Sequence, residues 1–189
     1  MRDLIGYIIL GVLLIVIVAI LYMPIYFRLR NKVALIRQIC FIGLAGTFFV
    51  IIFATLLLDI ISGIHMGNLF HPAIKMLNLV PLNWLHDTWK MGTEKMVTQI
   101  VANILMFVPL GFLLPVVFHK LRPSINTLSC ILVTSFSIEL LQYFIGRSAD
   151  IDDLIQNFIG GTIGYLFFWI LSLTLGKTRF WQKALGRIK

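Results

Sequence analysis

The sequence predicts an all-α integral membrane protein, a single membrane domain (residues 1–189) built as a bundle of five transmembrane helices. Hydrophobic residues make up 59% of the 189 residues, charged residues make up only 13%, and the mean hydropathy is +0.96. Soluble domains average about 45–50% apolar and about 25% charged residues. Five segments also have the length of roughly 20 residues that a helix needs to cross a bilayer. These features exclude a soluble globular enzyme and a disordered chain.

The first two predicted spans precede a long connection. Leu4–Phe27 is uncharged and ends at the basic stretch Arg28–Lys32, which is typical of a stop-transfer signal. This run is too long for a signal-peptide core and no small-residue cleavage site follows it, so we expect a retained helix. Gln38–Leu58 is also uncharged. The connection at residues 60–95 mixes Trp and Pro with apolar residues, which predicts an interfacial segment on the outer leaflet.

Three further spans and a basic tail complete the predicted bundle. Met96–Phe118 is uncharged, and Pro123–Ile145 carries one carboxylate, that of Glu139. Leu154–Gly176 contains glycines that allow close helix packing, namely Gly160, Gly161 and Gly164. In the tail, residues 177–189, apolar and basic residues alternate at helical spacing, which predicts an amphipathic helix on the inner leaflet.

The distribution of charge predicts the orientation of the bundle. Eleven of the sixteen Lys and Arg residues fall in the loop after the first span, the loop after the third span and the tail, and none of the eight acidic residues falls there. Cytoplasmic segments of membrane proteins carry such an excess of positive charge. We therefore expect the N-terminus outside and the C-terminus in the cytoplasm. The net charge of +8 then indicates orientation, and no nucleic-acid partner is predicted.

Glu139 is the most informative residue in the chain. An acidic side chain at the centre of a membrane helix costs about 2.5–3.5 kcal/mol on insertion scales, and such residues are functional candidates by default. In the predicted orientation Glu139, Asn103 and Asn157 lie on three different helices, all in the outer half of the membrane. Gln142 follows Glu139 by three residues and shares its helix face.

A polar segment just outside the fourth span extends this group. Arg147 can lean back toward Glu139, and the three aspartates after Arg147 can cap the start of the fifth span, where negative charge is favourable. Asp153 shares a helix face with Asn157. We therefore predict a net acidic, outward-facing binding pocket whose members are Asn103, Glu139, Gln142, Arg147, Asp150, Asp152, Asp153 and Asn157.

Five motifs occur in a fixed order along the chain: Asn78–Pro81, Asn103–Pro115, Ser137–Gln142, Arg147–Asp153 and Asn157–Tyr165. The ordered set spans about residues 78–165 and resembles the VanZ-like membrane family. This resemblance implies a bacterial protein of the cytoplasmic (inner) membrane with a role at the cell envelope, because the family's namesake is associated with resistance to the glycopeptide antibiotic teicoplanin. It implies no agreed chemistry.

Three functional hypotheses follow. The first is an envelope protein, non-catalytic or transport-like, that lowers susceptibility to glycopeptides or lipoglycopeptides by binding or moving an outer-leaflet lipid or a lipid-linked cell-wall precursor at the acidic pocket. Its partners are then membrane lipids and such a precursor or antibiotic. The second is a membrane-embedded enzyme that uses Glu139 as general acid or base on a lipid-linked substrate. The third is a structural partner subunit that packs against a larger complex through the glycine face of the fifth span. For Glu139 itself, the alternative to a functional role is a structural polar anchor tied to Asn103 and Arg147.

The sequence predicts no cofactor and assigns no catalytic residue beyond the candidate Glu139. It contains no phosphate-binding P-loop, no Gly-x-Ser-x-Gly elbow and no zinc-ligand spacing. Asp150, Asp152 and Asp153 have the oxygen ligands that Mg²⁺ and Ca²⁺ prefer. Acids at the start of a helix are more often caps, so these three aspartates are weak metal candidates and no metal is predicted.

Overall fold

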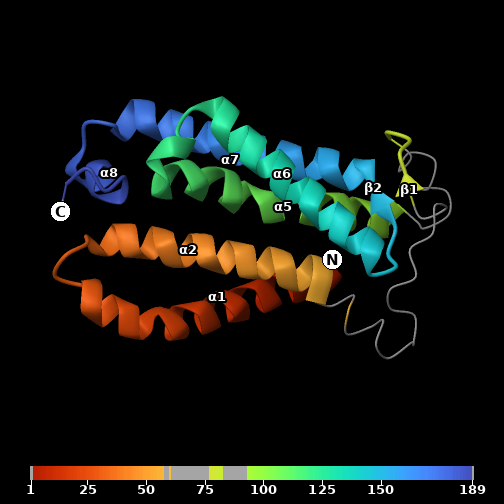
Figure 1. Cartoon of the computed structure of the whole chain (residues 1–189), viewed down its shortest axis with the longest axis horizontal. Helices are drawn as coiled ribbons and strands as arrows, with labels where there is room; N and C mark the ends of the chain where they lie inside the picture. The colour runs from red at the N-terminus through yellow and green to blue at the C-terminus, as the bar shows by residue number, and fades with distance from the viewer. Residues whose placement is uncertain (1, 58–59, 61–76, 83–92, 189) are drawn as a thin grey trace.

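The computed structural model describes residues 2–57, 60, 77–82 and 93–188 of the chain. In these ranges five long helices lie side by side along the long axis of the molecule (Figure 1): α1 (Arg2–Leu29), α2 (Leu35–Ile52), α5 (Thr93–Val117), α6 (Ser124–Phe144) and α7 (Ile151–Leu175). Each contains a stretch that is long and apolar enough to cross a membrane. The five predicted spans are therefore confirmed. Most of the predicted interfacial segment lies outside the described residues.

Short elements join and extend these helices. A five-residue π-helix, η1 (Phe53–Leu57), continues α2, and a 3-10 turn, η3 (His119–Leu121), precedes α6. The strands β1 (Leu77–Asn78) and β2 (Ala149–Asp150) pair in parallel, with Asn78 opposite Asp150. The prediction of an all-α chain missed this pair, because two-residue strands show no alternation of apolar and polar residues.

The helices α5 and α7 pack more extensively against each other than any other pair. Gly164 of α7 lies against the main-chain carbonyl of Val108, and Gly111 of α5 lies against the carbonyl of Gly161. A Cβ atom at Gly111 or Gly164 would collide with main-chain atoms of the other helix. The close packing predicted from the glycines of the last span is thus present, and it fixes α7 against α5.

Apolar side chains fill the bundle and also cover its outside. One core cluster gathers around Phe107, Leu110 and Ile131, on α5 and α6. Many large apolar side chains of all five helices are exposed, such as Leu21 of α1 and Leu173 of α7. Such a surface is expected where lipid surrounds the helices.

The connections divide the bundle into two chemically different ends (Figure 1). The α1–α2 connection, the α5–α6 connection and the C-terminal residues 176–188 meet at one end, which we call the basic end. There Arg37 donates hydrogen bonds to the carbonyls of Ala184 and Val117, both at 3.3 Å. The strands β1 and β2 and the start of α7 lie at the opposite end, the acidic end. The three basic segments therefore share one end of the bundle, as their sequence positions predict.

The C-terminal segment folds back onto the bundle as the short helix α8 (Arg179–Ala184). Trp181 and Leu185 are buried in a second apolar cluster with Val116 and Phe168, of α5 and α7. The protein therefore covers only part of the apolar face that the sequence predicts for this tail. Part of it packs on the protein, while Phe180 stays exposed.

Candidate functional site

Glu139 lies at the acidic end, where α6 meets the start of α7. Its side chain is only 7% exposed, and its Oε2 accepts a hydrogen bond of 2.9 Å from the main-chain N–H of Asp150. Since Asp150 belongs to β2 and also forms the N-cap of α7, this bond ties α6 to the first turn of α7. The charges of Asp153 and Arg147 also act on Glu139, so Arg147 lies near Glu139, as its position in the sequence suggested.

Asp150 and Asp152 tie the segment 77–82 to the start of α7. One oxygen of Asp150, Oδ1, accepts the main-chain N–H of Asp152 at 2.9 Å, which is the predicted helix cap. The other, Oδ2, accepts the side-chain amide of Asn78, also at 2.9 Å. Asp152 is buried and accepts the main-chain N–H of Leu82 at 2.7 Å. Leu82 has a positive φ of 63°, a conformation unusual for a leucine and frequent near functional sites.

These bonds do not support a metal site. The carboxylates of Asp150, Asp152 and Asp153 accept hydrogen bonds from different donors. In the part of the chain that the structure describes, no three or more His, Cys, Asp or Glu side chains are grouped so that they could hold a metal ion. The three aspartates act here as a helix cap and as acceptors that tie neighbouring segments together.

Asn103 of α5 has a different partner from the one expected if Glu139 were a polar anchor. Its Nδ2 donates to Oδ1 of Asp153 at 2.8 Å and to Oε1 of Gln156 at 3.0 Å, both on α7. The expected tie between Asn103 and Glu139 is therefore wrong. The amide instead joins α5 to α7 beside the acidic group.

Replacing Asn103 by alanine tests this link. Asn103→Ala removes the amide that donates to Asp153 and Gln156 and leaves these two polar groups with fewer partners. Because unpaired buried polar groups are costly, we expect the free energy of unfolding to fall by about 1–3 kcal/mol. Asn126→Ala is the matched control, since Asn126 is exposed and donates only to the nearby carbonyl of Lys120. Thermal unfolding in detergent measures both, and equal shifts would contradict a role for Asn103 in holding α5 to α7.

Gln142 and Asn157, the remaining members of the predicted pocket, face other parts of the bundle. Gln142 is 3% exposed and donates from Nε2 to the carbonyl of Thr55 in η1, at 3.0 Å. Asn157 donates to Oγ of Ser135 on α6, at 3.0 Å. Gln142 thus links α6 to the end of α2, and Asn157 links α7 to α6 one turn below Glu139. The eight predicted residues, which we call the polar layer, thus bond to partners on different elements, and only some of them touch one another.

Several partners of these residues were not predicted. Gln156 follows Asp153 by three positions and Ser135 precedes Glu139 by four, so helical spacing could have identified both. Asn78 lies in the first of the quoted motifs. The Thr55 partner is a main-chain carbonyl at the π-helix η1, and no side-chain pattern indicates it.

Comparison with known proteins gives two matches. The sequence model of the VanZ/LLP1 family matches residues 8–172, which include α1 and α2 as well as the motifs from Asn78 onward. The chain is also similar to Protein VanZ of Enterococcus faecium, with 29% identity over 91 residues, 48% of this chain and 53% of that protein. The chain thus spans about half the length of this curated relative. No solved structure shows a significant match.

The family match covers most of the chain, including four of the five long helices completely or almost completely. Together with the five apolar helices it indicates a multi-pass membrane protein. The protein belongs to the VanZ/LLP1 family.

Proposed function

We propose that the protein is an envelope protein of the bacterial cytoplasmic membrane that lowers susceptibility to teicoplanin and related lipid-bearing glycopeptides. Membership of the VanZ/LLP1 family and similarity to Protein VanZ support this function. The five helices support a location in the membrane. The protein then acts where such antibiotics meet lipid-linked cell-wall precursors.

The working site in this proposal is the polar layer at the acidic end. The observation that carries it is Glu139, a buried carboxylate on a membrane-spanning helix, held by the N–H of Asp150 and close to Arg147. A carboxylate beside a guanidinium can recognise a head group that carries both hydrogen-bond donors and an acidic group. We propose binding, or movement, of an outer-leaflet lipid or lipid-linked precursor, with no covalent step.

Resistance is tested by expressing the chain in a teicoplanin-susceptible bacterium. The minimal inhibitory concentration of teicoplanin should rise relative to an empty vector. A glycopeptide without a lipid tail should show a smaller change, since the proposed site acts at the membrane surface. An unchanged value for teicoplanin, with the protein present in the membrane fraction, would overturn the proposed function.

The acidic end must face outward for this site to work. The accumulation of Arg and Lys at the basic end supports this orientation. A reporter that is active only outside the cytoplasm should work when fused to the N-terminus, and one that is active only inside should work at the C-terminus. The reverse pattern would place the acidic end in the cytoplasm and contradict the proposal.

Binding and movement can be separated from enzymatic action in liposomes. Purified protein should bind labelled anionic lipid or lipid-linked precursor, or exchange it between leaflets, while the lipid keeps its mass. A stoichiometric change in the mass of the lipid, lost in Glu139→Gln, would instead identify an enzyme with Glu139 as acid or base.

A further inference from the structure

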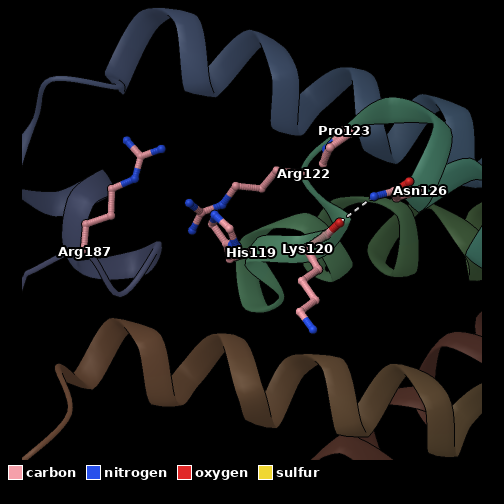
Figure 2. Close-up of a pocket in the computed structure, with 6 residues that line it drawn as sticks. All are labelled: His119, Lys120, Arg122, Pro123, Asn126 and Arg187. Carbon is pink, nitrogen blue, oxygen red and sulfur yellow. Dashed lines mark hydrogen bonds between the residues drawn. The ribbon is translucent and has the colours of Figure 1, made fainter.

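Two adjoining cavities lie at the basic end, far along the bundle from Glu139. The larger, of about 680 Å³, lies between the α5–α6 connection and the C-terminal segment. Figure 2 shows Arg187 reaching into it from the C-terminal side and Arg122 from the connection before α6. The smaller, of about 180 Å³, lies between α7 and α8 and shares Arg122 and Arg187 with the larger. The smaller cavity has room for a small polar group and the start of its substituent, whereas the larger one is a wide depression that is open to the outside.

Three residues that line the smaller cavity each carry a buried polar atom without a hydrogen-bond partner: Nε of Arg122, Oγ of Ser172 and Nε1 of Trp181. The Arg and Trp nitrogens can only donate, and a serine hydroxyl can donate. Trp181 itself is 3% exposed. Buried donors without acceptors are unfavourable and rare in proteins. Three of them around one cavity indicate that the cavity takes a ligand rich in acceptors.

The charges around the cavities select an anion. Burial, together with the positive charges of Arg187 and Arg37, lowers the pKa of the Arg122 guanidinium below its usual value. No acidic residue lines either cavity among the described residues. An accumulation of arginines with no carboxylate to balance them favours a phosphate group, which matches the planar guanidinium with several acceptor oxygens.

Arg122 and Trp181 are held in place before any ligand binds. The Nη2 of Arg122 donates to the carbonyl of Leu185 at 2.9 Å, and Tyr165 donates to the carbonyl of Arg122 at 3.0 Å. The indole of Trp181 lies 6.1 Å from the ring of Phe168 and 6.3 Å from that of Phe112, measured between centroids. Both side chains are therefore fixed by contacts that leave Nε of Arg122 and Nε1 of Trp181 without a partner, so little ordering is needed on binding.

We propose that these cavities form a binding site for a phosphate group, separate from the site at the acidic end. The indole N–H of Trp181, the Nε–H of Arg122 and the hydroxyl of Ser172 donate to the phosphate oxygens, and Arg187 adds positive charge from the larger cavity. The group can belong to an anionic phospholipid of the adjacent leaflet or to a free phosphate. The exposed side chain of Trp169, which lines the smaller cavity, suits the glycerol and acyl part of a lipid.

The test measures ligand-induced shifts in thermal unfolding of the full chain in neutral detergent. Short-chain phosphatidylglycerol and inorganic phosphate are titrated separately. A shift with phosphatidylglycerol alone supports the lipid source, and a shift with inorganic phosphate supports the free anion. The absence of a shift with both would overturn the proposal.

Two arginines of the C-terminal segment provide a matched pair. Arg187 and Arg179 are both exposed, but only Arg187 lines the cavities. Arg187→Gln should weaken binding several-fold, about the loss expected when one exposed positive charge of an ion pair is removed. Arg179→Gln removes the same charge and should bind as the wild type does. Equal losses in the two variants would show non-specific attraction to a basic surface and would contradict a built site.

Trp181→Phe tests the buried donor itself. The ring contacts with Phe112 and Phe168 are largely kept, while the unpartnered N–H is removed. The unliganded variant should therefore unfold at a temperature equal to or above that of the wild type, yet its ligand-induced shift should be smaller. A shift as large as that of the wild type, in a variant with normal unliganded stability, would remove Trp181 from the site and contradict the proposal.

Discussion

Gly111→Ala is expected to destabilise the bundle strongly, although it adds a single methyl group. A Cβ atom at this position would collide with the carbonyl oxygen and carbon and with the Cα of Gly161 on α7. Main-chain atoms cannot move aside as a flexible side chain does, so α5 and α7 must separate. Overpacking a close contact typically costs about 1–3 kcal/mol and occasionally more, and we expect a value at the upper end. Thermal unfolding in detergent should show a clear fall in Tm.

Two further variants make this result specific. Gly164→Ala meets the carbonyl of Val108 from the other side of the same interface and should lower Tm in the same way. Gly11→Ala is the control, because its Cβ would lie 3.9 Å from the nearest atom, Cγ1 of Val50, an ordinary contact. Alanine is favoured over glycine in a helix by about 1 kcal/mol, so Gly11→Ala should leave Tm unchanged or raise it. A Tm for Gly111→Ala equal to that of Gly11→Ala would refute the tight α5–α7 contact.

The sequence predicts the five helices well because membrane spans depend on length and composition. The predicted span Pro123–Ile145 and the observed α6, Ser124–Phe144, differ by one residue at each end. The glycines of the last span also predict a close approach, since small residues leave room for a neighbouring main chain. Burial in lipid and close packing both follow from properties of single side chains, so a linear sequence reveals them.

The partners of the polar residues are less predictable. The sequence places Asn103 and Glu139 at similar depths in their helices, yet Asn103 bonds to Asp153 and Gln156. Depth follows from position along a helix, whereas the choice of partner depends on the rotation of each helix and on which helices are neighbours. The parallel pairing of Asn78 with Asp150 joins residues 72 positions apart, and two-residue strands have no pattern that reveals such a pairing.

The C-terminal tail shows the same difference between what a sequence pattern predicts and what the packing of the helices determines. Its apolar residues recur at helical spacing, which predicts an amphipathic helix but not the surface that it covers. In the structure Trp181 and Leu185 pack on α5 and α7, while Phe180 faces outward. Periodicity therefore identifies a face of a helix, and only the three-dimensional arrangement shows whether protein or lipid covers it.

Glu139→Gln is the second change with a large expected effect, on function more than on stability. A glutamine carbonyl oxygen can still accept the N–H of Asp150, so the link between α6 and α7 is kept. The ionisable carboxyl group, on which the charge of Arg147 acts, is lost. We expect the protein to reach the membrane in normal amounts, while its contribution to teicoplanin resistance falls to the level of an empty vector. Resistance and protein abundance are measured in the same cells.

Two other variants on α6 decide how that result is read. Glu139→Ala leaves the N–H of Asp150 without its acceptor and should lower the free energy of unfolding by about 1–3 kcal/mol, so resistance and stability fall together. Ser137→Ala is the control, since Ser137 is exposed and bonds only within its own helix, to Val133, and it should behave as the wild type does. If Glu139→Gln keeps full resistance while Glu139→Ala loses stability, Glu139 is a structural anchor through its bond to Asp150. If Glu139→Gln loses resistance at normal stability, the ionisable carboxyl group itself is required, because the hydrogen bond alone cannot account for the loss.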